Sequence, residues 1–258
     1  MTPSADNGPI PAATLVLLRD CEVGPPELLM VERALAMRFA GGALVFPGGR
    51  IDAGDYRHAM ALHPQAPGNA AIAAAAIAAI RETLEEAGLP VGLSPMPHKA
   101  QLAAIRAGLH AGEDFATLLA HHHLALDTGS LTLFAHWCPN HPNMRIFDTL
   151  FFVAQAPAFA PEPIVDATEN TRVFWQSAHK TLDDAAAGRA AIIFPTKRNL
   201  ERLAQFSSYA DAAAHAARHP ICKITPWIEE RSGEPHLCIP EGLGYPITAE
   251  PMIRTRRG

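Results

Sequence analysis

The sequence has 258 residues, of which 48% are hydrophobic and 18% are charged, and its formal net charge is −5. This composition excludes a disordered chain and allows a sizeable core, so we expect a single enlarged domain over residues 1–258. The negative net charge does not fit the excess of Lys and Arg that is typical of a nucleic-acid-binding protein. An acidic protein can still bind phosphate groups if a bound cation supplies positive charge.

The cysteines and the apolar stretches indicate the cellular compartment of the protein. Cys21, Cys138, Cys222 and Cys238 are widely separated, which predicts neither a zinc knuckle nor a disulfide framework and favours reduced thiols. No stretch approaches the roughly 18 uninterrupted apolar residues of a membrane helix, and the N-terminal segment lacks the pattern of a secretory signal. We therefore expect a cytoplasmic protein that does not enter the membrane.

Taken in chain order, the sequence predicts strands and helices in mixed succession. Apolar runs bounded by breakers predict strands at residues 13–18, 28–33, 43–46, 131–137, 146–154 and 171–175. Helices are expected at residues 70–87, ended by Gly88, at 101–126 as one or two helices, and at 181–187 and 196–206. This order favours an α/β or α+β sandwich.

Two segments fall outside that regular pattern. Residues 52–68 contain Gly54, Pro64, Pro67 and Gly68. Such breakers predict irregular structure, with residues 56–68 as a protruding loop. The Pro-rich tail, residues 221–258, is expected to form a hairpin or an extended arm.

The end of the long helix carries the most informative residues. Successive helical residues turn by roughly 100°, which puts Glu82, Glu85 and Glu86 on one face and the aliphatic residues on the other. Clustered carboxylates repel one another unless a hard cation offsets the repulsion, and oxygen ligands suit Mg²⁺ or Mn²⁺. Arg81 is placed to pair with one of these acids. An isolated acidic face of this kind is more often solvated surface than a metal site.

The segment before the helix favours the metal site. The apolar run that ends at Phe46 is followed by Pro47, Gly48 and Gly49. Paired glycines let the backbone approach a metal or a phosphate more closely than bulkier residues would.

Together these residues resemble the Nudix box, Gx5Ex7REUxEExGU, in which U is aliphatic. Gly49 is followed after five residues by Asp55, where the family usually has Glu, and residues 81–89 follow the second half of the motif. Thr83 replaces the first aliphatic residue, and 25 residues separate Asp55 from Arg81 where the motif has seven. A loop can absorb such an insertion, placed at about residues 56–69, without moving the helix.

The resemblance implies a Nudix α/β/α sandwich with a mixed sheet, to which a helical insertion at about residues 99–126 and the C-terminal arm are added. The insertion inside the box resembles the coenzyme A diphosphatase-like branch of the family. That likeness extends to residues 45–49, to 146–149 with Phe151 and Phe152, and to 195–200. Arg38 and Gly42, spaced before residues 46–49, match the end of a coenzyme A-associated signature, whereas its beginning is poorly kept at residues 28–30.

Nudix enzymes use metal-assisted attack of water on a phosphorus atom of a diphosphate. The resemblance implies that Glu82, Glu85 and Glu86 ligate one to three divalent ions, joined by the carbonyl of Gly48. Glu82 or the distal acid Glu169 is the candidate base, with Arg81 as a further catalytic residue. Substrate contacts are expected from the following residues: Arg38, Gly49, Asp55 and Arg145.

Three functions remain open from the sequence. The first is hydrolysis of coenzyme A or acyl-CoA to a phosphopantetheine and 3',5'-ADP, and the second is hydrolysis of ADP-ribose or a dinucleotide of the NADH type. The third is a non-catalytic nucleotide-binding module. All three helix glutamates remain and no helix-turn-helix partner is visible, which favours catalysis on a small-molecule diphosphate. The oligomeric state is left open, with a homodimer among the options.

Overall fold

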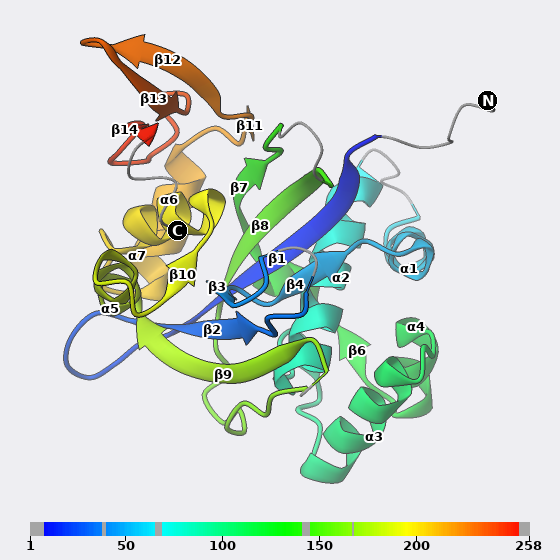
Figure 1. Cartoon of the computed structure of the whole chain (residues 1–258). Helices are drawn as coiled ribbons and strands as arrows, with labels where there is room; N and C mark the ends of the chain where they lie inside the picture. The colour runs from blue at the N-terminus through cyan, green and yellow to red at the C-terminus, as the bar shows by residue number, and fades with distance from the viewer. Residues whose placement is uncertain (1–7, 38–39, 65–68, 141–144, 167, 253–258) are drawn as a thin grey trace.

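A mixed β-sheet lies between two helical layers in the computed structural model of the chain (Figure 1). The structure describes residues 8–37, 40–64, 69–140, 145–166 and 168–252. Helices α1 to α4 cover one side of the sheet and α5 to α7 cover the other. This is the α/β/α sandwich with a mixed sheet that the sequence predicts.

The helices and strands have the following bounds. The strands are β1 Ile10–Arg19, β2 Glu27–Arg33, β3 Ala43–Val45, β4 Gly48–Arg50, β5 Leu93–Ser94, β6 Ala125–Leu126, β7 Thr132–Trp137, β8 Phe147–Gln155, β9 Asn170–Ser177, β10 Ala191–Ile192, β11 Lys223–Ile224, β12 Trp227–Arg231, β13 Glu234–Cys238 and β14 Ala249–Pro251. The helices are α1 Ala53–Leu62, α2 Ala70–Ala87, α3 Lys99–His110, α4 Phe115–His121, α5 Ala178–Ala186, α6 Phe194–Leu203 and α7 Tyr209–Arg218, with a 3₁₀ turn at Thr128–Ser130.

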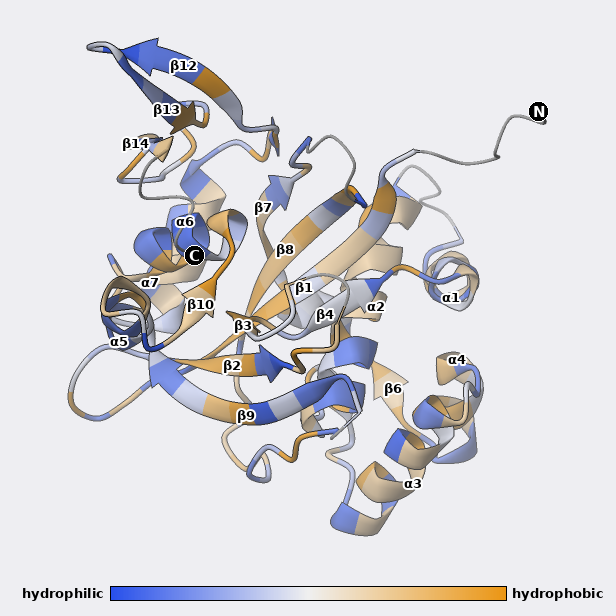
Figure 2. Ribbon diagram, viewed as in Figure 1, coloured by the Kyte–Doolittle hydropathy of each residue, from blue (hydrophilic) through white to orange (hydrophobic). Residues whose placement is uncertain are grey.

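The main sheet has the order β10-β3-β2-β1-β8-β7-β11, with β4 paired to β1 and β9 paired to β2. Strands β1 and β8 run parallel along nine paired positions, from Ile10 opposite Phe147 to Leu18 opposite Gln155. Because β1 also pairs with β2 and β4, it forms the centre of the sheet. Figure 2 shows that β1 and β8 are largely apolar, as expected of strands covered on both faces.

Successive side chains of β1 point to opposite faces of the sheet, and this alternation builds two cores. Val16 and Leu18 join the core under α5, α6 and α7, whereas Leu15 and Leu17 pack against the alanines of α2. A third cluster lies on the far side of α2, against α1, α3 and α4.

Helix α2 has the predicted bounds, and it ends at Gly88, which adopts a left-handed conformation with φ of 71°. Glu82, Glu85 and Glu86 lie together on one side of the helix and line a cavity, but α2 packs on two further sides where the sequence predicted one. Nearly every residue from Ala74 to Ala87 is buried, because the helix lies between the sheet and the α3–α4 pair. Its many alanines suit this position, since a small side chain lets a helix pack closely on two sides.

The predicted irregular segment at residues 52–68 is also different in the structure. Residues 53–62 form helix α1, which packs against α2 and α4. Asp52 and Asp55 form a capping box at its N-terminus, and this local signal outweighs the breakers that follow. The remaining part of the predicted loop falls largely on residues 65–68, outside the described residues.

Two further segments contain regular structure. Helices α3 and α4 occupy the predicted helical insertion, and the C-terminal arm forms the three-stranded sheet β12-β13-β14. The segment between β13 and β14 returns Leu243 and Tyr245 to the core under α6. No helix in the described ranges is long and apolar enough to cross a bilayer.

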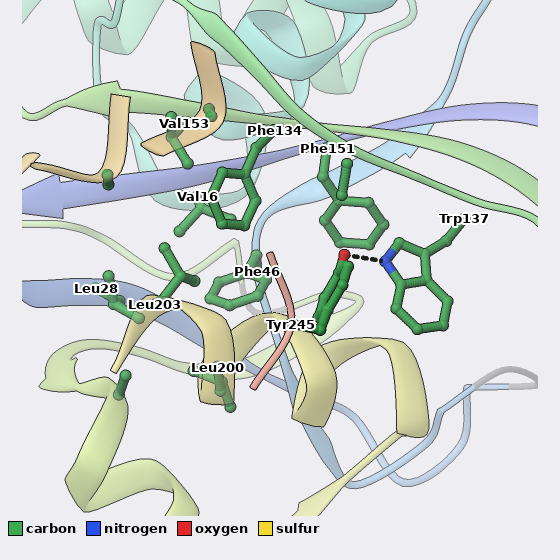
Figure 3. Close-up of a cluster of buried hydrophobic side chains, with 14 of the residues drawn as sticks. Val16, Leu28, Phe46, Phe134, Trp137, Phe151, Val153, Leu200, Leu203 and Tyr245 are labelled. Atoms are coloured by element: carbon green, nitrogen blue, oxygen red, sulfur yellow. Dashed lines mark hydrogen bonds between the residues drawn. The ribbon is translucent and has the colours of Figure 1, made fainter. Parts of the chain in front are cut away.

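Tyr245 of this returning segment lies in the core beside Trp137, to which Figure 3 shows its hydrogen bond. Its buried hydroxyl accepts a hydrogen bond from Trp137 Nε1 at 2.9 Å and donates one to Asn199 Oδ1 at 2.9 Å. The two bonds join β7, α6 and the C-terminal segment, so one residue links three parts of the core.

We expect Tyr245→Phe to destabilise the protein by about 1–3 kcal/mol, because the Trp137 and Asn199 groups would stay buried without a partner. For a chain of this size, that loss corresponds to a thermal midpoint lower by about 2–4 °C per kcal/mol, measurable by calorimetry. Tyr209→Phe is the control, since the Tyr209 hydroxyl makes no hydrogen bond in the described part of the chain. An unchanged midpoint for Tyr245→Phe would contradict the role given to its hydroxyl.

Candidate active site

The end of α2 lines a cavity of about 310 Å³. Strand β4 lies beside α2 because it pairs with β1 at the centre of the sheet. The cavity is rich in carboxylates, and its lining comprises Asp52, Arg81, Glu82, Glu85, Glu86, Leu109, Gly112, Glu113, Asp166, Thr168 and Glu169. The structure thus brings the three helix glutamates and the distal acid candidate Glu169 to one place.

Arg81 organises the acids at the base of this cavity. Its guanidinium donates to both carboxylate oxygens of Asp55, at 3.1 and 2.9 Å, and to Glu82 Oε1 at 2.9 Å. It also donates to the carbonyl of Arg50 at 3.0 Å. Burial alone would lower the pKa of Arg81, but its hydrogen bonds to Asp55 and Glu82 raise it. Arg81 is therefore a fixed cation that orients Glu82.

Glu82 and Glu86 are unusually hard to ionise in the protein alone. Burial raises the pKa of Glu82 to about 7, with the charge of Glu85 adding to the rise and Arg81 opposing it. Burial raises the pKa of Glu86 to about 8, and the charge of Glu82 adds to that rise. Acidic side chains outnumber cationic ones along the cavity, and a further cation there would favour the ionised form of both acids.

The glycine pair before the helix approaches protein groups rather than open space. The N–H of Gly48 donates to Glu86 Oε2 at 3.1 Å. A Cβ at Gly49 would lie closer than 3.0 Å to the carboxylate of Glu82. Gly49 therefore lets β4 come close to Glu82, whereas Gly48 reaches Glu86 through its backbone N–H.

The loop before β9 supplies the outer wall of the cavity. Glu169 is largely exposed, with 58% of its side chain accessible, and it forms a 3.5 Å ion pair with Arg33. Asp166 accepts hydrogen bonds from the hydroxyl of Thr168 and from the backbone N–H groups of Glu169 and Asn170. Although burial opposes it, these hydrogen bonds lower the pKa of Asp166, so an ionised aspartate holds the loop together.

Arg106 of α3 fastens the end of the acidic helix. It donates to the backbone carbonyl oxygens of Glu85 at 2.8 Å, Glu86 at 3.1 Å and Ile164 at 2.6 Å. The last carbonyl groups of a helix have no partner within the helix, and a cation there is favourable. Arg106 thus joins the helical insertion, α2 and the loop that carries Asp166.

Several residues of this site were not predicted from the sequence. They are Arg33, Asp52, Arg106, Glu113, Asp166 and Asn170. Only Asp52 had a local signal, its spacing from Asp55 in a capping box. The others reach the site through contacts between segments that are distant in the sequence.

The predicted substrate contacts have mixed outcomes. Asp55 is 3% exposed and faces Arg81, so its role changes from a substrate contact to support of Arg81. Gly49 lies against Glu82, and Arg145 is exposed before β8; neither lines the cavity. Arg38 lies outside the described residues.

Thr83, the polar departure from the motif, fits its position without disturbing the helix. The residue is fully buried, and its hydroxyl donates to the carbonyl of Ala79 at 2.7 Å. The hydroxyl is therefore satisfied by the helix itself, so a polar residue can stand where the motif has an aliphatic one.

No protein-family model matches the sequence, and no curated protein matches it either. Among solved structures, a NUDIX hydrolase from Alicyclobacillus acidocaldarius matches with a TM-score of 0.69 and 28% sequence identity, covering 81% of this chain and 97% of that chain. This chain has the Nudix hydrolase fold. The predicted enzyme class, a Nudix hydrolase acting on phosphorus-containing acid anhydrides, is confirmed at this level.

More distant Nudix structures also match. The NUDIX domain of Shewanella oneidensis NrtR, complexed with ADP ribose, has 12% identity and a TM-score of 0.44, covering 80% of this chain and 92% of that domain. A C. elegans Ap4A hydrolase has 13% identity and a TM-score of 0.38, covering 80% of this chain and 93% of that one. These likenesses are too distant to bear on the substrate.

The side chains of the Nudix site fit a divalent cation by their chemistry. Carboxylate oxygens from Glu82, Glu85 and Glu86 are the hard donors that Mg²⁺ and Mn²⁺ prefer. Among the residues that line the cavity in the described part of the chain, Arg81 alone carries a positive charge against these carboxylates. Among the described residues, no group of three or more acidic, histidine or cysteine side chains has the arrangement of a complete metal-ligand set. Arg81 and the Gly48 N–H engage carboxylate oxygens instead.

Proposed function

We propose that this chain hydrolyses a diphosphate bond in a nucleotide-derived substrate with the help of Mg²⁺ or Mn²⁺ held by Glu82, Glu85 and Glu86. One observation carries the proposal: three glutamates of a Nudix-fold helix converge on a cavity whose described lining has seven acidic side chains and one cationic side chain, Arg81. A diphosphate is itself an anion, so it would be repelled from this cavity without metal ions.

The protein groups then have separate tasks. A bound divalent ion supplies charge neutralisation and water activation. Arg81 holds Glu82 in one orientation through a 2.9 Å hydrogen bond, and Arg106 holds the end of the helix that carries Glu85 and Glu86. Glu169 lies on the open wall of the cavity, where a carboxylate has access to the proton of an attacking water. Glu82 is the alternative base.

For the substrate we propose coenzyme A or acyl-CoA, cleaved to a phosphopantetheine and 3',5'-ADP. The support is the sequence likeness around the box, namely the insertion between Asp55 and Arg81 and the spacing of Arg38 before residues 46–49. ADP-ribose and dinucleotides of the NADH type are the alternative substrates, because the same carboxylates serve any diphosphate.

A panel of substrates tests both levels of this proposal. Purified protein is incubated with coenzyme A, acyl-CoAs, ADP-ribose and NADH in Mg²⁺ or Mn²⁺, and the products are identified by mass. We expect cleavage of coenzyme A or acyl-CoA with release of 3',5'-ADP. Cleavage of ADP-ribose alone would replace the substrate proposal, and turnover of none with intact nucleotide binding would favour a non-catalytic module.

Arg38→Ala tests the coenzyme A assignment on its own. A charge-assisted hydrogen bond to the 3'-phosphate is worth about 1.5–3 kcal/mol, so we expect KM for coenzyme A to rise by roughly 10-fold or more. KM for ADP-ribose, which lacks that phosphate, should change less. Equal losses on both substrates would place Arg38 at the shared diphosphate, and no loss on either would remove it from the site.

A further inference from the structure

Asn170 is the first residue of β9 and is only 2% exposed. Its side-chain amide Nδ2 donates to Glu86 Oε1 at 3.2 Å. Its Oδ1 is buried and has no hydrogen-bond partner among the described residues. The side-chain amide thus donates to Glu86, while its own acceptor is left without a hydrogen-bond partner among the described residues.

The backbone of Asn170 is held independently of Glu86. Its N–H donates to Asp166 Oδ1 at 3.2 Å, and the residue pairs with Arg33 across β2 and β9. The side chain thus reaches α2 from a strand of the main sheet, which is a more rigid support than a loop.

The carboxylate of Glu86 consequently accepts hydrogen bonds from two different strands. Gly48 of β4 donates to Oε2, and Asn170 of β9 donates to Oε1. Each carboxylate oxygen accepts more than one hydrogen bond or ligand, so both oxygens keep a free lone pair. An amide suits this position better than an acid, because it donates without adding negative charge to a cavity already rich in carboxylates.

We propose that Asn170 is a positioning residue that fixes the plane of the Glu86 carboxylate so that its free lone pairs face the divalent ion. The role rests on the proposed metal site. It assigns to the first residue of β9 a contribution to the active site beside that of the preceding residue, Glu169.

Mn²⁺ binding to the full-length, metal-free protein tests this role without any substrate. Free Mn²⁺ is followed by electron paramagnetic resonance in titrations of wild type, Asn170→Ala, Glu86→Gln and the double variant. Loss of a hydrogen bond to a charged group corresponds to about 10-fold to 100-fold, so Asn170→Ala should bind Mn²⁺ more weakly by that factor. In the Glu86→Gln background the same change should add little, because residues that act through one another are not additive.

The matched control is Thr171→Ala, the next residue of β9. Thr171 is exposed, and its hydroxyl contacts the carbonyl of Glu32 rather than α2, so its Mn²⁺ affinity should equal that of wild type. Asn170→Asp keeps the volume of the side chain and removes the donor. This second variant tests the same hydrogen bond if Asn170→Ala fails to fold, and it should also bind Mn²⁺ more weakly than wild type.

Three results would overturn the proposal. Asn170→Ala with wild-type Mn²⁺ affinity would show that Glu86 binds the ion without being oriented by Asn170. Additive losses in the double variant would show that Asn170 affects Mn²⁺ binding independently of Glu86. Asn170→Asp with tighter binding would show that the oxygen of the side chain, not its amide nitrogen, faces the ion. Unchanged Mn²⁺ binding in Glu86→Gln would instead overturn the metal site itself.

Discussion

Glu85→Gln and Glu86→Gln are expected to abolish most turnover while leaving the fold intact. Both carboxylates line the cavity, and an amide keeps their size but loses the charge that a divalent ion requires. Glu82→Gln should be similarly severe, since loss of a metal ligand or general base costs about 10²–10⁴ in rate. The measurement is kcat in saturating Mg²⁺ or Mn²⁺, beside a thermal midpoint for each variant.

Glu230→Gln is the control for these variants, because Glu230 is exposed on β12, outside the cavity. It should retain wild-type turnover. Raising the metal concentration should partly restore Glu85→Gln if that residue acts as a ligand. A folded Glu85→Gln or Glu86→Gln protein with near-normal rates would remove the residue from the metal site.

The central elements of the site could be predicted because their signals are local. The bounds of α2, its end at Gly88 and the shared face of Glu82, Glu85 and Glu86 all follow from helical periodicity and one capping residue. The glycine turn before the helix is likewise a contiguous stretch. These features can be predicted without knowing which residues pack against them.

The errors came from tertiary contacts. Helix α1 was expected to be a loop because Pro and Gly are dense after it, yet its capping box and its packing on α2 and α4 form the helix. Helix α2 was expected to pack on one side only, whereas its alanines pack on the sheet and Ile77, Ile80 and Leu84 pack against α3 and α4.

The residues missed by the sequence are held by long-range contacts. Asn170 contacts Glu86 across 84 residues, and Arg106 contacts Ile164 across 58. No short motif links such positions, and each residue type is common on protein surfaces. Only the folded sheet, which brings β4 and β9 to the end of α2, shows that these side chains support the acids.

Gly49→Ala is expected to lower turnover by about 100-fold or more with little loss of stability. A Cβ at this position would meet the carboxylate of Glu82, at the far end of a side chain that Arg81 holds in place. Glu82 would have to move, and a displacement of about 1 Å in a catalytic group costs on the order of 10² in rate. The measurements are kcat, Mn²⁺ affinity and the thermal midpoint of the variant.

Gly48→Ala provides the contrast, because a Cβ at the neighbouring glycine would meet strand β1 instead of an acid of the cavity. Its Cβ would lie 2.8 Å from Thr14 Cα and still closer to the carbonyl oxygen of Ala13, so β4 would have to move away from β1. Overpacking of this kind costs about 1–3 kcal/mol or more, and we expect a lower thermal midpoint for Gly48→Ala. If Gly49→Ala instead lost stability and kept its turnover per folded molecule, the close approach of Gly49 to Glu82 would be a packing feature without a part in catalysis.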